Sequence, residues 1–119
     1  MISKKIVVQS IIEKVEKEHD DLEIKTSLVE GFSQPDKIIN EGKRDTGYTP
    51  DVLLRDDNST DIYEVELDKD FNLDKWRLFS LISNKQKGSF IIVTPEDNIP
   101  QVRKALDENQ INARIIYFS

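Results

Sequence analysis

Three carboxylates in the middle of the chain, Asp51, Glu64 and Glu66, are the residues best suited to chemistry. Residues 62–67 are predicted to form a strand, and side chains two positions apart on a strand point to the same face. Glu64 and Glu66 therefore project together, while the apolar residues beside them point the other way. In a half-buried hairpin we expect the apolar set to take the core and the two glutamates to share one surface.

Asp51 is expected to join the two glutamates. It follows Pro50 and begins a second predicted strand over 51–54, and a turn signal at 56–59 indicates an antiparallel hairpin. Such a hairpin places Asp51 opposite the end of the strand that carries the glutamates. The three carboxylates are therefore predicted to converge.

Carboxylates this close raise each other's pKa, and a divalent cation removes that penalty. Their oxygens suit Mg²⁺ or Mn²⁺, and such a metal activates water or stabilises a leaving oxygen in phosphodiester hydrolysis. The alternative is that Glu64 and Glu66 form the solvated face of a strand, since acidic segments are usually surface. Residues 51–74 do hold nine acids and two bases, a net charge of −7 in a chain of net charge −6.

Lys75 is the lysine most suited to accompany these carboxylates. It begins a helix predicted over 73–87, and the residues at i+3, i+4 and i+7 are apolar: Leu78, Phe79 and Ile82. Lys75 therefore lies on the sheet-facing stripe, where a charged group needs a partner. The alternative is that its side chain runs along the helix end to solvent. Lys69 is closer in sequence, but its loop position does not predict its direction.

The elements that position these residues follow from the apolar pattern. Helices are predicted over 4–19, 73–87 and 96–108, and strands over 22–30, 51–54, 62–67, 90–93 and 113–118. Residues 31–48 are predicted to be a polar loop with a short helical turn at 35–40. Thr94 and Pro95 are predicted to be the N-cap and first residue of the last helix. The order α-β-β-β-α-β-α-β indicates an α/β domain over 1–119, with a central mixed sheet flanked by helices on both faces.

Pro50-Asp51, a hairpin and then Glu64-Val65-Glu66 resemble the motif of the PD-(D/E)XK nuclease superfamily, whose fold is called restriction-endonuclease-like. The resemblance extends over nearly the whole chain, because the order of helices and strands around the motif also matches. It implies a metal-dependent nuclease that acts on DNA, with Asp51 and Glu64 holding Mg²⁺ or Mn²⁺. In that superfamily an acid on the first helix sometimes joins the metal site. Glu13 and Glu16 are the candidates here, and the spacing does not choose between them.

The chain departs from the family motif at Glu66, where the superfamily has a lysine that positions or activates the attacking water. Two outcomes are open. Either Glu66 is a third metal ligand or a base, and Lys75 supplies the missing positive charge, or the site has lost catalysis and keeps only the scaffold. The second outcome makes the chain a non-catalytic interaction or regulatory domain. A third reading is an unrelated doubly wound α/β domain in which residues 51–67 are only a polar hairpin.

Composition excludes several other kinds of site. The chain has 119 residues and no cysteine, so disulfides, thiolate metal sites and cysteine nucleophiles are absent. Its one histidine, His19, is expected at the end of the first helix, which argues against a Ser-His-Asp triad or a histidine zinc site. No glycine-rich phosphate loop occurs. No apolar run approaches the roughly 20 residues of a membrane span, so we expect a cytoplasmic protein without a membrane partner.

DNA is the expected substrate or partner, although the chain is acidic. Lys43 and Arg44, in the loop before Asp51, and Arg77 on the middle helix are the candidates to contact phosphates. An acidic protein binds nucleic acid only where local positive patches outweigh its overall field, and the alternative is that these are scattered solubilising charges. A core this small lacks added elements to grasp a duplex, so we also expect a homodimer or a partner protein. Trp76 is expected to be a packing residue.

Overall fold

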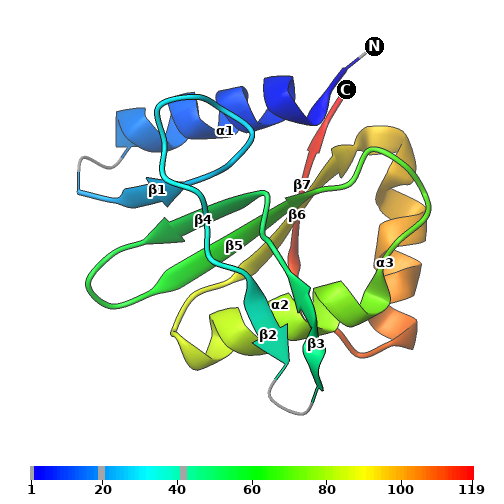
Figure 1. The fold of residues 1–119 in the computed structure, drawn as a ribbon. Coiled ribbons are helices and arrows are strands. Elements are labelled where there is room, and N and C mark those ends of the chain that lie inside the picture. Colours follow the sequence, from blue (N-terminus) through cyan, green and yellow to red (C-terminus); the bar gives the residue numbers. More distant parts are fainter. Residues whose placement is uncertain (1, 19–20, 41–42) are drawn as a thin grey trace.

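The mixed sheet that the sequence predicts is present at the centre of the fold (Figure 1). The computed structural model describes residues 2–18, 21–40 and 43–119, and of residues 40 and 43–46 it describes only the backbone. Five strands lie in the order β1-β4-β5-β6-β7. Their bounds are Glu23–Lys25 (β1), Val52–Arg55 (β4), Thr60–Val65 (β5), Phe90–Pro95 (β6) and Arg114–Phe118 (β7). β1, β4 and β5 pair antiparallel, whereas β5, β6 and β7 pair in parallel.

One face of the sheet is covered by helix α1 (Lys4–Glu18). Its apolar residues recur on one side of the helix, as the helical period requires. The buried ones are Val7, Val8, Ile12 and Val15. They pack with the β-strand residues of this face, Val52, Leu54, Val65, Ile91 and Val93. Helix α1 thus anchors the antiparallel strands that carry the predicted carboxylates.

The opposite face is covered by α2 (Leu73–Lys85) and α3 (Ile99–Glu108). The core between these helices and the sheet is largely aromatic and isoleucine: Ile62, Trp76, Phe79, Phe90 and Ile92. Helix α2 begins at a defined point, because the side chain of Asn72 accepts a hydrogen bond from the backbone N–H of Lys75. This cap fixes Lys75 in the first turn of α2. The predicted sheet with helices on both faces is confirmed.

The predicted loop at 31–48 is wrong in part, because it contains a second sheet. Strands β2 (Ile38–Asn40) and β3 (Lys43–Tyr48) form an antiparallel pair, with Ile38 opposite Tyr48. There is no helical turn at 35–40 in the described residues. Ile38 and Tyr48 pack against the core beneath α2, and this tertiary contact holds a segment whose polar composition resembles a loop.

One predicted strand boundary and one predicted helix cap are also wrong. The strand predicted over 22–30 ends at Lys25, because the chain turns at Thr26, whose hydroxyl donates to the backbone oxygen of Asp51 (2.7 Å). The last helix begins with a 3₁₀ turn, η1 (Glu96–Asn98), before α3. The proline in the first turn of α3 is therefore Pro100, and Thr94 does not cap this helix.

His19 lies outside the described residues. None of the helices in the described segments has both the length and the apolar character of a membrane crossing.

Candidate functional site

Two hydrogen bonds hold Asp51 and Glu64 next to each other at the end of the β4–β5 hairpin that lies opposite its turn. The backbone N–H of Asp51 donates to Oε1 of Glu64 at 3.0 Å, and the backbone N–H of Val65 donates to Oδ2 of Asp51 at 2.9 Å. The register that pairs Val52 with Tyr63 sets Asp51 level with Glu64. The structure therefore brings these two carboxyl groups together, as the hairpin geometry predicts.

Glu64 is buried, with 1% of its surface exposed. Its Oε2 atom lies 2.8 Å from Nζ of Lys75, but the approach is outside hydrogen-bond geometry, and this oxygen accepts no well-formed hydrogen bond from the described residues. Burial, which has the largest effect, and the negative charge of Asp51 raise the pKa of Glu64, while Lys75 and the backbone N–H of Asp51 lower it, and together they bring this pKa to about 7. Glu64 is thus a carboxyl that titrates near neutral pH.

Glu66 lies just beyond β5, on the same side as Glu64. Its Oε1 atom accepts a hydrogen bond from the indole N–H of Trp76 at 3.0 Å and lies 3.9 Å from Nζ of Lys75. Its backbone oxygen accepts from the hydroxyl of Thr94 at 2.8 Å. Only 8% of Glu66 is exposed. The prediction that the two glutamates share an exposed surface is therefore wrong, because α2 covers the face on which they lie.

Lys75 is the positive charge at the centre of this cluster. Its side chain is 19% exposed and reaches from the first turn of α2 to Glu64, with Glu66 further off. Burial by itself lowers the pKa of Lys75, but the negative charge of Glu64 at contact distance and the charges of Glu66 and Asp51 together outweigh it and raise the pKa. Lys75 therefore stays protonated at neutral pH. Its side chain is directed to the carboxylates and does not run to solvent.

Lys4 and Trp76 belong to the cluster although sequence reasoning did not place them there. The ammonium of Lys4, in the first turn of α1, lies 3.1 Å from Oδ2 of Asp51. No spacing signal connects residues 47 positions apart. The sequence predicts only a packing role for Trp76, but a buried indole N–H needs an acceptor, and its position next to Lys75 on α2 is the signal that connects it to the cluster.

Several predicted residues lie away from the cluster. Glu13 and Glu16 are exposed on α1, and within the described segments no hydrogen bond or ion pair connects either one to Asp51. Arg77 is exposed and lies 3.5 Å from the carboxylate of Asp74. Lys43 and Arg44 are on β3, but their side chains lie outside the described part of the structure.

The cluster suits a metal ion only in part. No group of three or more carboxylate, histidine or cysteine side chains is arranged to hold a metal ion in the described residues. Glu66 is engaged with Trp76, which does not support its predicted role as a third ligand. Mg²⁺, however, commonly keeps several waters and binds only one or two carboxylates. Asp51 and Glu64 fit that smaller set, since Glu64 Oε2 holds an ion-pair contact without a formed hydrogen bond.

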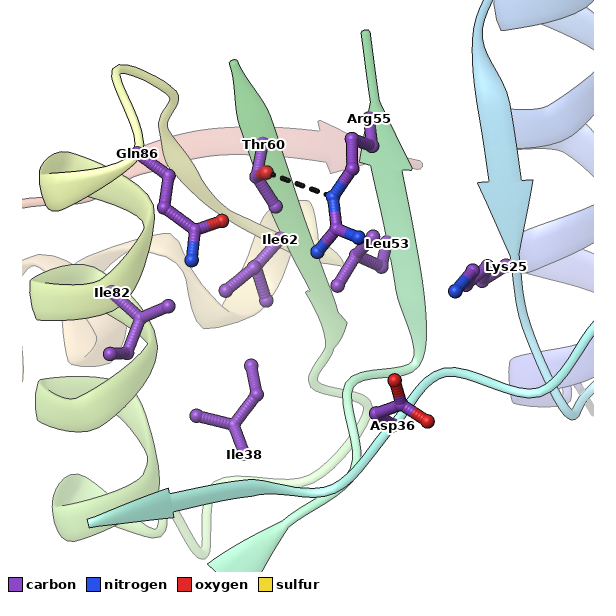
Figure 2. A pocket seen from close by; sticks show the side chains of 9 residues that line it. All are labelled: Lys25, Asp36, Ile38, Leu53, Arg55, Thr60, Ile62, Ile82 and Gln86. Atoms are coloured by element: carbon purple, nitrogen blue, oxygen red, sulfur yellow. Dashed lines mark hydrogen bonds between the residues drawn. The ribbon is translucent and has the colours of Figure 1, made fainter. Parts of the chain in front are cut away.

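A small pocket on the same face of the sheet lies at the other end of β4 and β5 (Figure 2). It has a volume of about 70 Å³, and its polar lining includes Lys25, Asp36 and Arg55. Nε of Arg55 donates to the hydroxyl of Thr60 at 3.3 Å. With one carboxylate against two cations, this pocket is no candidate for a metal ion, and the carboxylate cluster remains the candidate site.

Comparison of the chain with protein-family models, curated proteins and solved structures finds no match in any of the three. The function of the site therefore rests on its own geometry.

Proposed function

We propose that the chain is a divalent-metal-dependent nuclease that hydrolyses phosphodiester bonds of DNA, on a restriction-endonuclease-like fold. The observation that carries the proposal is the buried carboxyl group of Glu64, which lies 2.8 Å from the ammonium of Lys75 and beside the carboxylate of Asp51. Burying a charged carboxylate such as that of Glu64 lowers the stability of the folded state. Perturbed titratable groups of this kind cluster at functional sites.

In this proposal Asp51 and Glu64 hold Mg²⁺ or Mn²⁺. A metal bound there would supply an activated water and stabilise the leaving oxygen of a phosphodiester. Lys75 keeps its positive charge next to Glu64 and stabilises negative charge that develops on the phosphoryl oxygens. Glu66 acts as a positioning residue, because Trp76 fixes its carboxylate within 3.9 Å of Lys75.

The arrangement of elements supports the finer fold assignment. A leading helix, an antiparallel meander of β1, β4 and β5, and two parallel crossovers to β6 and β7 follow the order that the superfamily resemblance implies. The hairpin of β2 and β3 is an addition to that order. Lys75 also lies beside the carboxylates, where a lysine from outside the motif can supply the positive charge. This position of Lys75 accounts for Glu66 where the superfamily motif has its lysine.

The second candidate is a non-catalytic interaction or regulatory domain on the same scaffold. The observation that favours it is that protein donors already engage every carboxylate of the cluster: Lys4 on Asp51, Lys75 on Glu64 and Trp76 on Glu66. In that case the cluster joins α1 and α2 to the sheet and no metal enters it.

Cleavage of DNA separates the two candidates. Supercoiled plasmid and labelled single- and double-stranded oligonucleotides are incubated with the protein in Mg²⁺, in Mn²⁺ and in EDTA. We expect metal-dependent cleavage by the wild type that is lost in Glu64→Gln and kept in Glu108→Gln, an exposed glutamate on α3. Equal cleavage by Glu64→Gln would show a contaminant or another site. No cleavage of any substrate would favour the non-catalytic candidate.

A further inference from the structure

Strand β7 is an edge of the main sheet. It pairs with β6, and its other side has no partner strand in the described part of the chain. Its sequence, Arg-Ile-Ile-Tyr-Phe, has no proline and only one charge. Exposed edges of this kind pair readily with another strand, and proteins usually block them with charges, prolines or very short strands. The strand at the opposite edge, β1, has only three residues, so it is protected from pairing by its short length.

Exposed apolar side chains gather beside this edge. A groove of about 600 Å³ lies between α1 and β7, where Figure 1 shows the start of α1 and the end of β7 side by side. Four of the six exposed large apolar residues in the described segments line it: Ile2, Ile6, Ile116 and Tyr117. Apolar surface concentrated in this way marks an interaction site.

The charges around the groove indicate which partner fits. Among the described residues, the charged ones that line the groove are two bases and two acids: Lys14, Arg114, Glu18 and Asp61. This face is therefore neutral in a chain of net charge −6. Two copies of an acidic chain repel each other least where the local charge is balanced.

We propose that the chain forms a two-fold symmetric dimer in which β7 pairs antiparallel with β7 of a second copy. Antiparallel pairing of one strand with itself satisfies a two-fold axis, in which the same surface contacts itself. The pairing saturates the free edge of β7 and joins the two grooves, so that α1 of each copy covers apolar residues of both.

The proposed dimer rests on the β7 edge and the groove beside it and is independent of the nuclease, but it would extend the proposed nuclease function. A two-fold axis perpendicular to the sheet keeps the α2 faces of both copies on the same side. The two copies of β5 would then be five strand spacings apart, about 24 Å, and would run in opposite directions. Two oppositely directed sites suit the two antiparallel strands of a duplex, and they extend the small surface that one copy offers.

Sedimentation equilibrium tests the dimer with matched variants. We expect wild-type protein to have twice the chain mass of 13.8 kDa at high-micromolar concentration, and Ile116→Lys and Tyr117→Lys to be folded monomers by circular dichroism. Leu81→Lys, at an exposed apolar residue on α2 outside the groove, should stay dimeric. A monomeric wild type would overturn the proposal, and so would a dimer that survives in both β7 variants or is lost equally in Leu81→Lys.

Crosslinking gives a second readout that does not depend on mass. The chain has no cysteine, so a disulfide in an Ile116→Cys variant can form only between copies. Rapid disulfide formation in Ile116→Cys, compared with Leu81→Cys, is the expected result. Equal rates in the two variants would contradict the β7 interface. Neither readout involves metal or DNA, so failure of the nuclease proposal leaves this test unaffected.

Discussion

The ammonium of Lys75 lies 2.8 Å from Oε2 of Glu64, and this contact links the first turn of α2 to the end of β5. Glu64 accepts from the backbone of Asp51 with its other oxygen, so the contact connects the helix to both strands of the hairpin. Whether Glu64 is charged therefore affects the stability of three elements at once.

Stability is expected to fall as pH rises through the titration of Glu64. Its pKa in the folded protein is raised from 4.5 to about 7, so the folded state binds the proton more tightly than the unfolded state. The stabilisation from this proton is complete below the unfolded pKa and is lost as pH rises through 7. We expect Glu64 to account for a decrease of about 3 kcal/mol in the free energy of unfolding between pH 4.5 and pH 8.

Urea unfolding of wild type and Glu64→Gln at pH 5 and pH 8, in EDTA, measures how much Glu64 contributes to the pH dependence of the free energy of unfolding. Glutamine imitates the protonated glutamate, so the two proteins should be similar at pH 5, and the variant should be the more stable at pH 8. Identical pH dependence in both proteins would show that Glu64 does not titrate in this range.

Loss of the Lys75 ammonium is expected to be costly only where Glu64 is charged. In Lys75→Met the buried carboxylate loses its cation, and removal of one partner of a buried ion pair costs about 3 kcal/mol. We expect that loss near pH 8, with a smaller effect near pH 5, where Glu64 carries its proton. Lys85→Met, at an exposed lysine of the same helix, is the control and should be near wild type at both pH values. Equal destabilisation of Lys75→Met at pH 5 and pH 8 would contradict the pairing.

Lys4 is expected to oppose the binding of a cation. Its ammonium lies 3.1 Å from Asp51 Oδ2, where it repels a divalent ion and competes for the same carboxylate. Since an ion pair of this exposure is worth up to about 1 kcal/mol, Lys4→Met should bind Mn²⁺ about five-fold more tightly in calorimetry. Lys5→Met removes the same charge from an exposed neighbour and should change affinity less. Weaker binding by Lys4→Met would instead make Lys4 a support of the site.

The local pattern of the sequence predicted much of the site, because its key relationships are short in sequence. The strand period places Glu64 and Glu66 on one face, the hairpin sets Asp51 against Glu64, and the helical period directs Lys75 inward. Each of these follows from backbone geometry within one or two elements.

Other features depend on contacts between distant segments and could not be predicted in the same way. The burial of Glu64 and Glu66 depends on α2 covering their face, and the pairing of Lys4 with Asp51 joins two elements without any spacing signal. The β2–β3 hairpin is held by the packing of Ile38 and Tyr48 on the α2 core. Pro95 and Pro100 both suit a helix start, and only the packed structure distinguishes them.

The proposed nuclease requires a divalent cation bound by Asp51 and Glu64, and a thermal denaturation series in Mg²⁺ and Mn²⁺ measures that binding. A ligand that binds only the folded state raises the melting temperature with its concentration. We predict such a rise for wild type and for Glu108→Gln, and none for Glu64→Gln. No shift of the wild type at millimolar metal, or an equal shift of Glu64→Gln, would show that Asp51 and Glu64 do not bind a divalent cation.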